Sequence, residues 1–403
     1  MDSAILNDPF LLAKKHLLEL TRGLPSGTVP VSVIQDLSSM HPDWPVWPDL
    51  ALSDLIGPPN VRLKEVDLRW LHRFRATIAL LGWLSAQLGG PKGGPSALSL
   101  VVERAPILGH RGWGAVSAGG SCRILTTADG QIAANLPRVE DQSSVAAWLD
   151  APIEGTDWAS IERAVQQVTS SELLSRAKLL GMPISAVGET KVPSGFEYNI
   201  GKEIQLKQKP RVVDLSSMWA GPLCSWYLMR CGAEVTKIES ILRPDKPRNW
   251  PDIFYQRLNQ GKEIIPLDFS SSIDLERLRN IIRGSDIIIE GSRPRALEHL
   301  GIDAKEEVRR GAIWCSITGY GRRWNPHRVG FGDDAAAGAN LLAEINGSLW
   351  FMGDAIADPI TGATAATLVL GYWLGCSSAL LDLGLSPTAA LYSQGLLSRA
   401  SSF

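Results

Sequence analysis

The sequence predicts an α/β protein whose C-terminal half, residues 206–403, contains a doubly wound parallel sheet. Five short apolar runs in this half are rich in β-branched residues and have the length of strands: RVVDLS, EVTKIES, KEIIPLDF, DIIIEGS and AIWCSITGYG. Segments with helical spacing, such as 222–232 and 273–283, separate most of these runs. Strands that alternate with helices form parallel βαβ units, which assemble into a sheet with helices on both faces.

The chain before residue 206 divides into two further regions. Residues 1–95 are expected to be mainly helical, most clearly over 68–88, and they end near the Gly/Pro-rich stretch GGPKGGPS. Residues 96–205 are expected to form a small α+β domain. Its strand-like runs are ALSLVVE, SCRILTTADG and QIAANL, and helical patterns follow around 145–149 and 158–180.

Composition narrows the class of function. The chain has 403 residues and a net charge of −2, so it offers no basic surface for nucleic acid and no polybasic membrane anchor. Its five dispersed cysteines form no CxxC pair, and no histidine spacing suits a metal, which predicts reduced thiols in a cytoplasmic protein without a metal site. The N-terminal residues do not have the pattern of a signal peptide.

Two further features decide against a membrane span and a bound nucleotide. Residues 359–381 are uncharged and long enough to cross a bilayer, but they are rich in Thr, Gly, Ala and Ser and have no basic flank, so a buried helix is expected. The turn after the first strand of the sheet, DLSSMWAGP, contains no GxGxxG, and the chain has no GxxxxGK[ST]. No permanently bound cofactor is therefore expected.

Asp354 and Asp358 stand at the start of this apolar stretch, in MGDAIADPITGATAATLVLG. From spacing alone, Asp358 followed by Pro359 is typical of a helix N-cap with proline at the first helical position. Asp354 follows a glycine and is expected in a turn.

The order of several motifs in 206–403 resembles that in class III CoA-transferases, the CaiB/BaiF family of carnitine, formyl and bile-acid CoA-transferases. The segments that carry the resemblance are VVDLSSMWAGPLCSWYLMRCGAEVTKIES, LRPDKPR, LNQGKEIIPLDFS, SDIIIEGSRPRALEHLGI, AIWCSITGYGRR and VGFGDDAAAGAN. IADPITGATAATLVLG then resembles the family's Ala-Asp followed by an apolar helix. By this resemblance Asp358 is the nucleophile, which forms covalent anhydride and thioester intermediates while CoA passes from an acyl-CoA to a carboxylic acid.

The resemblance also implies an unusual chain order. GGSCRILTTADGQIAANL and ASIERAVQQVTSSELLSRAKLLGMPISAV, both within 96–205, resemble the second half of the family, yet here they precede the sheet. The implied fold is a circularly permuted class III CoA-transferase with a Rossmann-like CoA-binding domain. The family forms intertwined dimers, so a homodimer is expected, with acyl-CoA and a carboxylic acid as the small-molecule partners.

Coenzyme A enters this interpretation as a substrate, and the motif positions imply which residues line its slot. They are Trp219, Ala220, Ser240, Leu267, Ser270, Gly291, Ser292, Arg293, His299, Val329, Phe331 and Gly332. Lys262, Arg293, Arg295 and Arg328 are candidates for pairing with its phosphates, with a solvated surface as the alternative. Ser240, Ser270 and the pair Gly291–Ser292 depart from the residues common in the family.

Several alternatives remain open at this point. Gly119 and Gly120 are either a loop that covers the reacting carboxylate or a plain hairpin turn. Trp219 either borders the acyl pocket or belongs to the core, and His110 and His327 are expected to be structural. A non-catalytic acyl-CoA-binding subunit is the main competing function. An α-methylacyl-CoA racemase is disfavoured because Phe331 stands where that enzyme has a histidine.

Overall fold

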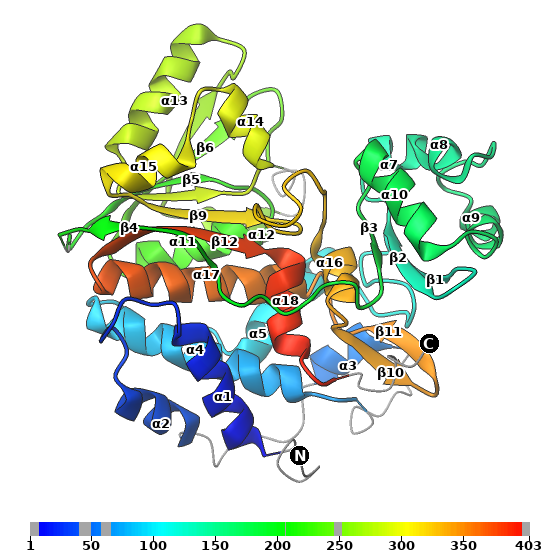
Figure 1. Cartoon of the computed structure of the whole chain (residues 1–403), viewed down its shortest axis with the longest axis horizontal. Coiled ribbons are helices and arrows are strands. Elements are labelled where there is room, and N and C mark those ends of the chain that lie inside the picture. Colours follow the sequence, from blue (N-terminus) through cyan, green and yellow to red (C-terminus); the bar gives the residue numbers. More distant parts are fainter. Residues whose placement is uncertain (1–7, 40–49, 58–65, 206, 246–251, 397–403) are drawn as a thin grey trace.

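The computed structural model describes residues 8–39, 50–57, 66–205, 207–245 and 252–396. A seven-stranded sheet forms its centre, in the order β4-β12-β9-β8-β5-β6-β7 (Figure 1). The strands, in that order, are β4 (Glu197–Glu203), β12 (Ser377–Gly384), β9 (Ile313–Thr318), β8 (Ile287–Glu290), β5 (Arg211–Leu215), β6 (Glu234–Ser240) and β7 (Glu263–Leu267).

All neighbouring strands of this sheet are parallel except β4, which pairs antiparallel with β12 at one edge. Numbered by their place along the chain, the six parallel strands have the spatial order 3-2-1-4-5-6, which is the Rossmann arrangement. The predicted doubly wound sheet is thus confirmed. Strand β4 lies within the proposed small domain of residues 96–205 by sequence, but it belongs to this sheet.

Helices cover both faces of the sheet because the strands are buried on both sides. On one face lie α11 (Ala220–Arg230) and α17 (Ala357–Leu374), with α12 (Asp252–Asn259) packed on α11; on the other lie α13 (Ser272–Gly284), α14 (Pro294–His299) and α15 (Ala304–Arg310). Alternate residues of one strand enter opposite cores: Ile287 and Ile289 face α11 and α17, whereas Ile288 faces α13.

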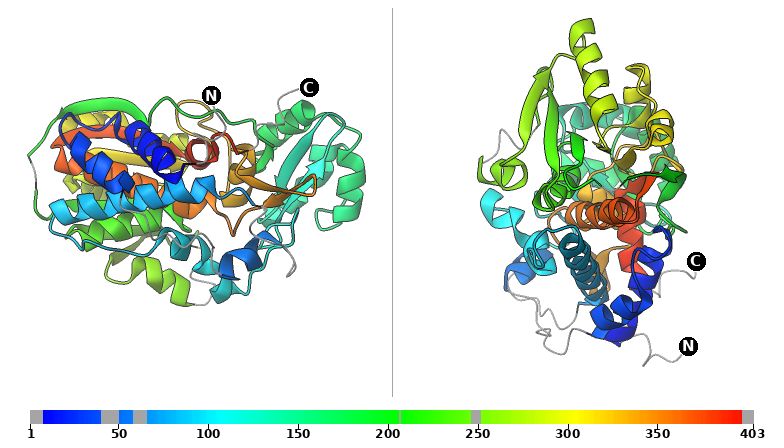
Figure 2. Two further views of the ribbon diagram at one scale, coloured as in Figure 1. Left: turned by 90° about the horizontal axis from the view of Figure 1, so that it is seen from below. Right: turned by 90° about the vertical axis from the view of Figure 1, so that its left-hand side faces the viewer.

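The N-terminal helices form a further layer on the far side of α17, as the end-on view of Figure 2 shows. They are α1 (Pro9–Thr21), α2 (Val31–Ser39), α3 (Leu50–Ile56), α4 (Arg69–Gln87), α5 (Ala97–Val102) and α6 (Arg104–Leu108). Phe74 and Leu80 of α4 are fully buried in the same core as the residues of α17. None of the described helices is both long and apolar enough to cross a membrane.

The strand expected at 97–103 is wrong, because this segment is helix α5. Ala97, Leu100 and Val101 follow helical spacing and are buried, and the Ser96 hydroxyl accepts a hydrogen bond from the Ser99 N–H (3.0 Å) as an N-cap. A short apolar run does not distinguish a strand from a buried helical turn, and here the cap decides for the helix.

A smaller unit lies to one side of the sheet domain (Figure 1). Its antiparallel sheet is β1-β2-β3, and three of its four helices pack on one face. The elements are β1 (Cys122–Thr126), β2 (Gln131–Asn135), α7 (Val139–Ser143), α8 (Val145–Leu149), α9 (Trp158–Val165), α10 (Ser170–Leu180) and β3 (Ile184–Ala186). The helical pattern at 158–180 is therefore two helices, the second capped by Thr169.

The remaining elements connect the two units. They are α16 (Gly332–Gly338), the hairpin β10 (Leu342–Ile345) and β11 (Ser348–Phe351), and α18 (Leu385–Ser393). Helix α16 packs against β2 and β3, and the Asn135 amide of β2 donates to Asp334 Oδ1 (2.9 Å). The smaller unit is thereby held against the carboxyl ends of the sheet strands.

Candidate active site

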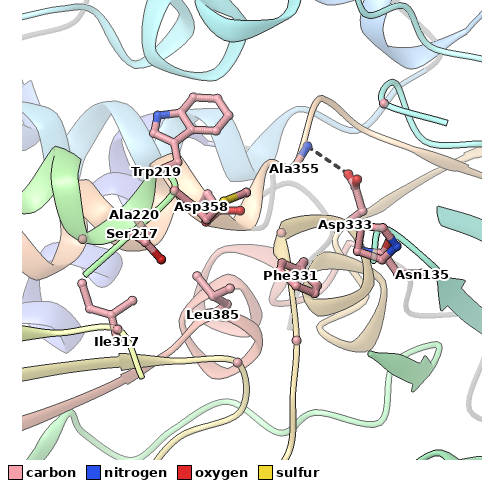
Figure 3. Close-up of a pocket in the computed structure, with 18 of the residues that line it drawn as sticks. Asn135, Ser217, Trp219, Ala220, Ile317, Phe331, Asp333, Ala355, Asp358 and Leu385 are labelled. Carbon is pink, nitrogen blue, oxygen red and sulfur yellow. Dashed lines mark hydrogen bonds between the residues drawn. The ribbon is translucent and has the colours of Figure 1, made fainter. Parts of the chain in front are cut away.

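A cavity of about 590 Å³ opens at the carboxyl ends of the parallel strands (Figure 3). Ser216 and Gly291 line it just beyond β5 and β8, Thr318 lines it at the end of β9, and Leu385 follows β12. The chain order reverses at β5 and β8, and ligands of open α/β sheets bind at this kind of edge. The cavity therefore occupies the position that the fold favours for a ligand.

Asp358 lines the cavity from the first turn of α17. Its side chain is only partly exposed, and the nearby Ala220 N–H acts to lower the pKa of its carboxyl group. Burial raises the pKa of Asp358 to about 7, with Asp333 and Asp354 also raising it and Arg104 opposing the rise. At neutral pH this carboxyl is divided between its acid and anionic forms.

The segment around Gly332, at the first residue of α16, lies unusually close to Asp358. A Cβ at Gly332 would meet Asp358 Oδ2 at 2.2 Å and the Ala355 carbonyl oxygen at 2.5 Å. Only glycine fits such a close approach of two backbone segments. The absence of a side chain at residue 332 therefore allows the first turn of α16 to lie directly against the Asp358 carboxylate.

Asp333 is a second carboxylate in the cavity, next to Gly332. Its Oδ1 accepts a hydrogen bond from the Ala355 N–H at 2.9 Å, drawn as the dashed line in Figure 3. Ala355 has a left-handed backbone with φ of 47°. Burial raises the pKa of Asp333 to about 6, and the negative charge of Asp354 adds to that rise.

Asp354 is fully buried and forms an ion pair with Arg104. Arg104 Nε donates to Asp354 Oδ2 at 2.8 Å, and Arg104 Nη2 donates to Oδ1. His110 Nδ1 lies 3.1 Å from the same Oδ1. Despite its burial, the pKa of Asp354 is lowered to about 2, because Arg104 and His110 together outweigh the cost of desolvation.

The loop between β5 and Ala220, which leads to Asp358, is held by a buried ion pair and two hydrogen bonds. Lys262 Nζ lies 3.1 Å from Asp214 Oδ2, at the end of β5, and both side chains are fully buried. Lys237 Nζ donates to the Ser216 carbonyl at 2.7 Å. The Met218 N–H, at a residue with φ of 71°, donates to Asp245 Oδ1 (2.9 Å).

The structure brings only part of the predicted CoA slot into this cavity. The predicted residues that line it are Trp219, Ala220, Gly291, Phe331, Gly332 and Asp358, together with Gly119. The other predicted residues do not line it: Ser240, Leu267, Ser270, Ser292, Arg293, His299, Val329 and Gly120. Ser240 and Leu267 end β6 and β7, further along the same edge of the sheet, and the Leu267 side chain is buried in the core on the α13 face.

Two of the phosphate candidates are wrong. Lys262 is buried on Asp214, as described above, and cannot reach a ligand at the surface. Arg328 is buried as well: its Nη2 donates to Glu189 Oε1 and to the Ile184 carbonyl, and its guanidinium stacks over Tyr320. Arg293 and Arg295 are exposed and stay candidates.

The N-cap prediction for Asp358 is also wrong. The N-cap is Ile356 and helix α17 begins at Ala357, so Asp358 is the second helical residue and Pro359 the third. Gly119 and Gly120 lie in a turn before β1, closed by the Gly120 N–H to the Ser117 carbonyl at 2.8 Å. Gly119 lies against the His110 ring.

Sequence reasoning missed three ionisable residues of the cavity wall, Arg104, His110 and Asp333, as well as several uncharged ones. Arg104 and His110 lie about a quarter of the way along the chain, whereas Asp354 lies near its C-terminal end, so no local pattern connects them. Asp333 stands in the quoted motif VGFGDDAAAGAN, where its position at the start of α16 was the available signal.

Residues 208–373, which contain most of the sheet and Asp358, match the family model described as CoA-transferase family III. Over this segment, which is less than half of the chain, the sequence is similar to CoA-transferase family III. An acyl-CoA transferase of Fusarium pseudograminearum is 30% identical over 217 residues, which cover 46% of this chain and 47% of that protein. The succinyl-CoA:glutarate CoA-transferase of Homo sapiens is 27% identical over 166 residues, covering 39% of this chain and 37% of that protein.

The chain matches less than half the length of each of these two relatives. Among solved structures, a CaiB/BaiF family protein from Brucella suis aligns with 49% of this chain and 56% of its own, with 23% sequence identity and a TM-score of 0.42.

Proposed function

We propose that this chain is an enzyme that transfers CoA from an acyl-CoA thioester to a carboxylic acid, with Asp358 as the covalent nucleophile. The observation that carries the proposal is the position of Asp358: it lies in the family III segment and lines the cavity at the carboxyl ends of the strands. The relatives' names, acyl-CoA transferase and succinyl-CoA:glutarate CoA-transferase, support the same reaction class.

The reaction proceeds in four substitutions at acyl carbons. The Asp358 carboxylate attacks the thioester carbonyl, the C–S bond breaks, and CoA leaves as the thiolate, which gives a mixed anhydride. The thiolate then attacks the aspartyl carbonyl, and the donor acid leaves as its carboxylate. The acceptor carboxylate attacks the resulting aspartyl thioester and releases the thiolate again. Finally, the thiolate attacks the acceptor carbonyl, so that the new acyl-CoA forms and the Asp358 carboxylate is regenerated.

The surroundings of Asp358 suit these steps. Limited exposure protects an anhydride from water, and the raised pKa makes the carboxylate more basic than an ordinary aspartate. The Ala220 N–H and the positive charge of Arg104 favour the ionised form that attacks. The Trp219 ring, fully buried against Phe254, forms a rigid wall beside the reacting carboxyl.

We further propose that CoA extends from Asp358 along the carboxyl edge of the sheet, past Ser240 at the end of β6 and toward Ser270 beyond β7. The exposed Arg293 and Arg295 would pair with its phosphates. The unit containing β1, β2 and β3 would be the family's second half in permuted order, and two copies would form a cytoplasmic homodimer. All five cysteines are free thiols, which agrees with a reducing compartment.

The experiment incubates the protein with a panel of acyl-CoAs and carboxylic acids and follows new acyl-CoAs by mass spectrometry. We expect turnover in the wild type and in Asp150→Asn, an exposed position at the end of α8, and none in Asp358→Asn. CoA binding without turnover would instead support the acyl-CoA-binding subunit. Exchange of the α-proton with solvent deuterium, without transfer, would support the racemase.

A further inference from the structure

We propose that Asp354 and His110 are positioning residues that hold the Arg104 guanidinium beside Asp358, so that the N-terminal part of the chain sets the charge of the reacting carboxyl. The importance of that charge for catalysis rests on the function proposed above. The arrangement itself is independent of it.

The contact between Arg104 and Asp354 fixes the orientation of the guanidinium. Two different nitrogens of Arg104, Nε and Nη2, donate to the two oxygens of Asp354. Such a fork leaves little freedom to rotate. The Arg104 side chain is 8% exposed and the Asp354 side chain 0%, so water does not compete with the pair.

His110 adds a second contact from the same part of the chain. Its Nδ1 lies 3.1 Å from Asp354 Oδ1, the oxygen that also accepts from Arg104 Nη2. Both Arg104 and His110 line the cavity. Asp354 therefore joins two side chains from 104–110 to the loop that leads into α17.

A second surface holds Arg104 on its other side. Its guanidinium carbon lies 4.7 Å from the centre of the Trp219 ring, within the range of a cation–π interaction. Trp219 immediately precedes Ala220, which lines the cavity with Asp358 and whose N–H acts to lower the pKa of Asp358. Arg104 is thus held between the two segments that position the carboxylate: residues 219–220 and residues 354–358.

The position of Arg104 matters because the other charged groups close to Asp358 are carboxylates. Asp333 and Asp354 are negative neighbours from α16 and from the loop before α17, and both raise the pKa of Asp358. Arg104 is the positive neighbour that lowers it, and His110 lies next to both Arg104 and Asp354. Without a fixed Arg104, three carboxyl groups would share one buried site, and Asp358 would stay protonated to a higher pH.

The residues of this cluster come from two distant parts of the chain. Arg104 and His110 lie outside the segment 208–373 that matches the family model, whereas Asp354 and Asp358 lie inside it. Helix α5, directly before Arg104, packs on α4 and α17 through buried side chains. The N-terminal layer therefore delivers a charged residue to the site in addition to covering α17.

The test measures the protonation of Asp358 directly, by NMR titration of protein labelled with ¹³C at the aspartate carboxyl carbons, with the Asp358 signal assigned from Asp358→Asn. We expect Arg104→Met to raise the titration midpoint by roughly one pH unit or more, the usual effect of losing a close opposite charge. An unchanged midpoint would overturn the proposal.

A double-mutant cycle separates positioning from the charge of Asp354 itself. In the Arg104→Met background, Asp354→Asn removes only a negative charge and lowers the midpoint. In the wild-type background it also releases Arg104, so we expect a smaller fall or a rise. An equal or larger fall in the wild-type background would overturn the positioning role. The double variant also removes both buried charges together, which guards against loss of folding from an unpaired ion.

His110 provides a milder pair of variants because its ring is partly exposed. We expect His110→Ala to raise the midpoint by less than Arg104→Met does, and His110→Gln, which keeps a hydrogen-bond donor, to restore the wild-type value. A glutamine variant that behaves like alanine would show that His110 does not act by positioning. If the enzyme assay fails while these midpoints move as expected, the proposed function is wrong and this inference stands.

Discussion

Gly332 lies so close to Asp358 that an added methyl group would be 2.2 Å from the carboxylate oxygen Oδ2. The relationship joins the start of α16 to the start of α17, two helices that both begin at the cavity. On this side, the Asp358 carboxylate therefore faces the backbone of residue 332 and not a side chain.

The first prediction is that Gly332→Ala sharply reduces transfer while the protein still folds. The new methyl group must displace Asp358 or the Ala355 carbonyl, and a misplacement of about 1 Å costs on the order of 10²-fold in rate. The measurement is kcat/KM with the best acyl-CoA of the panel. Gly93→Ala is the matched control, since its Cβ would meet no atom within 4 Å; equal rates for the two variants would refute this reading of the contact.

The second prediction concerns pH. In the proposed reaction the attacking form is the carboxylate, and the pKa of Asp358 is raised to about 7, so kcat/KM should fall as the pH drops below about 7. Asp333→Asn removes a negative neighbour and should move this acid limb to lower pH. A limb near pH 4 in the wild type, the range of an ordinary aspartate, would contradict the buried setting of Asp358.

The third prediction follows from the same pKa through its effect on stability. The folded protein holds the Asp358 proton more tightly than the unfolded chain, so this group favours folding at low pH, and that contribution is lost as the pH rises from about 4 through about 7. Asp358→Asn escapes the loss. Its Tm relative to the wild type should rise between pH 5 and pH 8, as measured by differential scanning calorimetry; a constant difference would argue against it.

The fourth prediction distinguishes Lys262 from a phosphate ligand. Lys262→Met leaves Asp214 buried without its partner, which should lower the free energy of unfolding by about 3–5 kcal/mol. Arg295→Ala, at an exposed position, should change stability by less than about 0.5 kcal/mol but raise the KM for the acyl-CoA. Urea denaturation and initial rates measure the two effects. A stable Lys262→Met protein with only a raised KM would reverse this assignment.

The alternation of apolar strands with helices was sufficient to predict the doubly wound sheet, because each parallel strand is buried on both faces and reads as a continuous apolar run. Strand β4 could not be placed in the same way. It pairs with β12, far along the chain, and only that pairing shows that it belongs to the large sheet. Helix α5 was mistaken for a strand since six residues are too few to establish a period.

The site was predictable only where a local motif contains its residues. Asp358 and Gly332 stand in such motifs. The ion pair between Arg104 and Asp354 joins residues 250 positions apart, and each residue alone is an ordinary charged side chain. They form a buried ion pair only in the folded protein, and no local sequence pattern indicates that these two side chains are buried together. Lys262 was misplaced for the same reason, because a lysine next to a glycine looks exposed until its partner Asp214 is known.

The most direct measurement of the central claim is hydroxylamine trapping during turnover, followed by peptide mass spectrometry. An anhydride or thioester on Asp358 reacts with hydroxylamine to give a hydroxamate on that side chain. The account predicts a hydroxamate at Asp358 in the wild type, dependent on acyl-CoA and absent from Asp358→Ala. A hydroxamate at another carboxyl, or transfer that persists in Asp358→Ala, would contradict it.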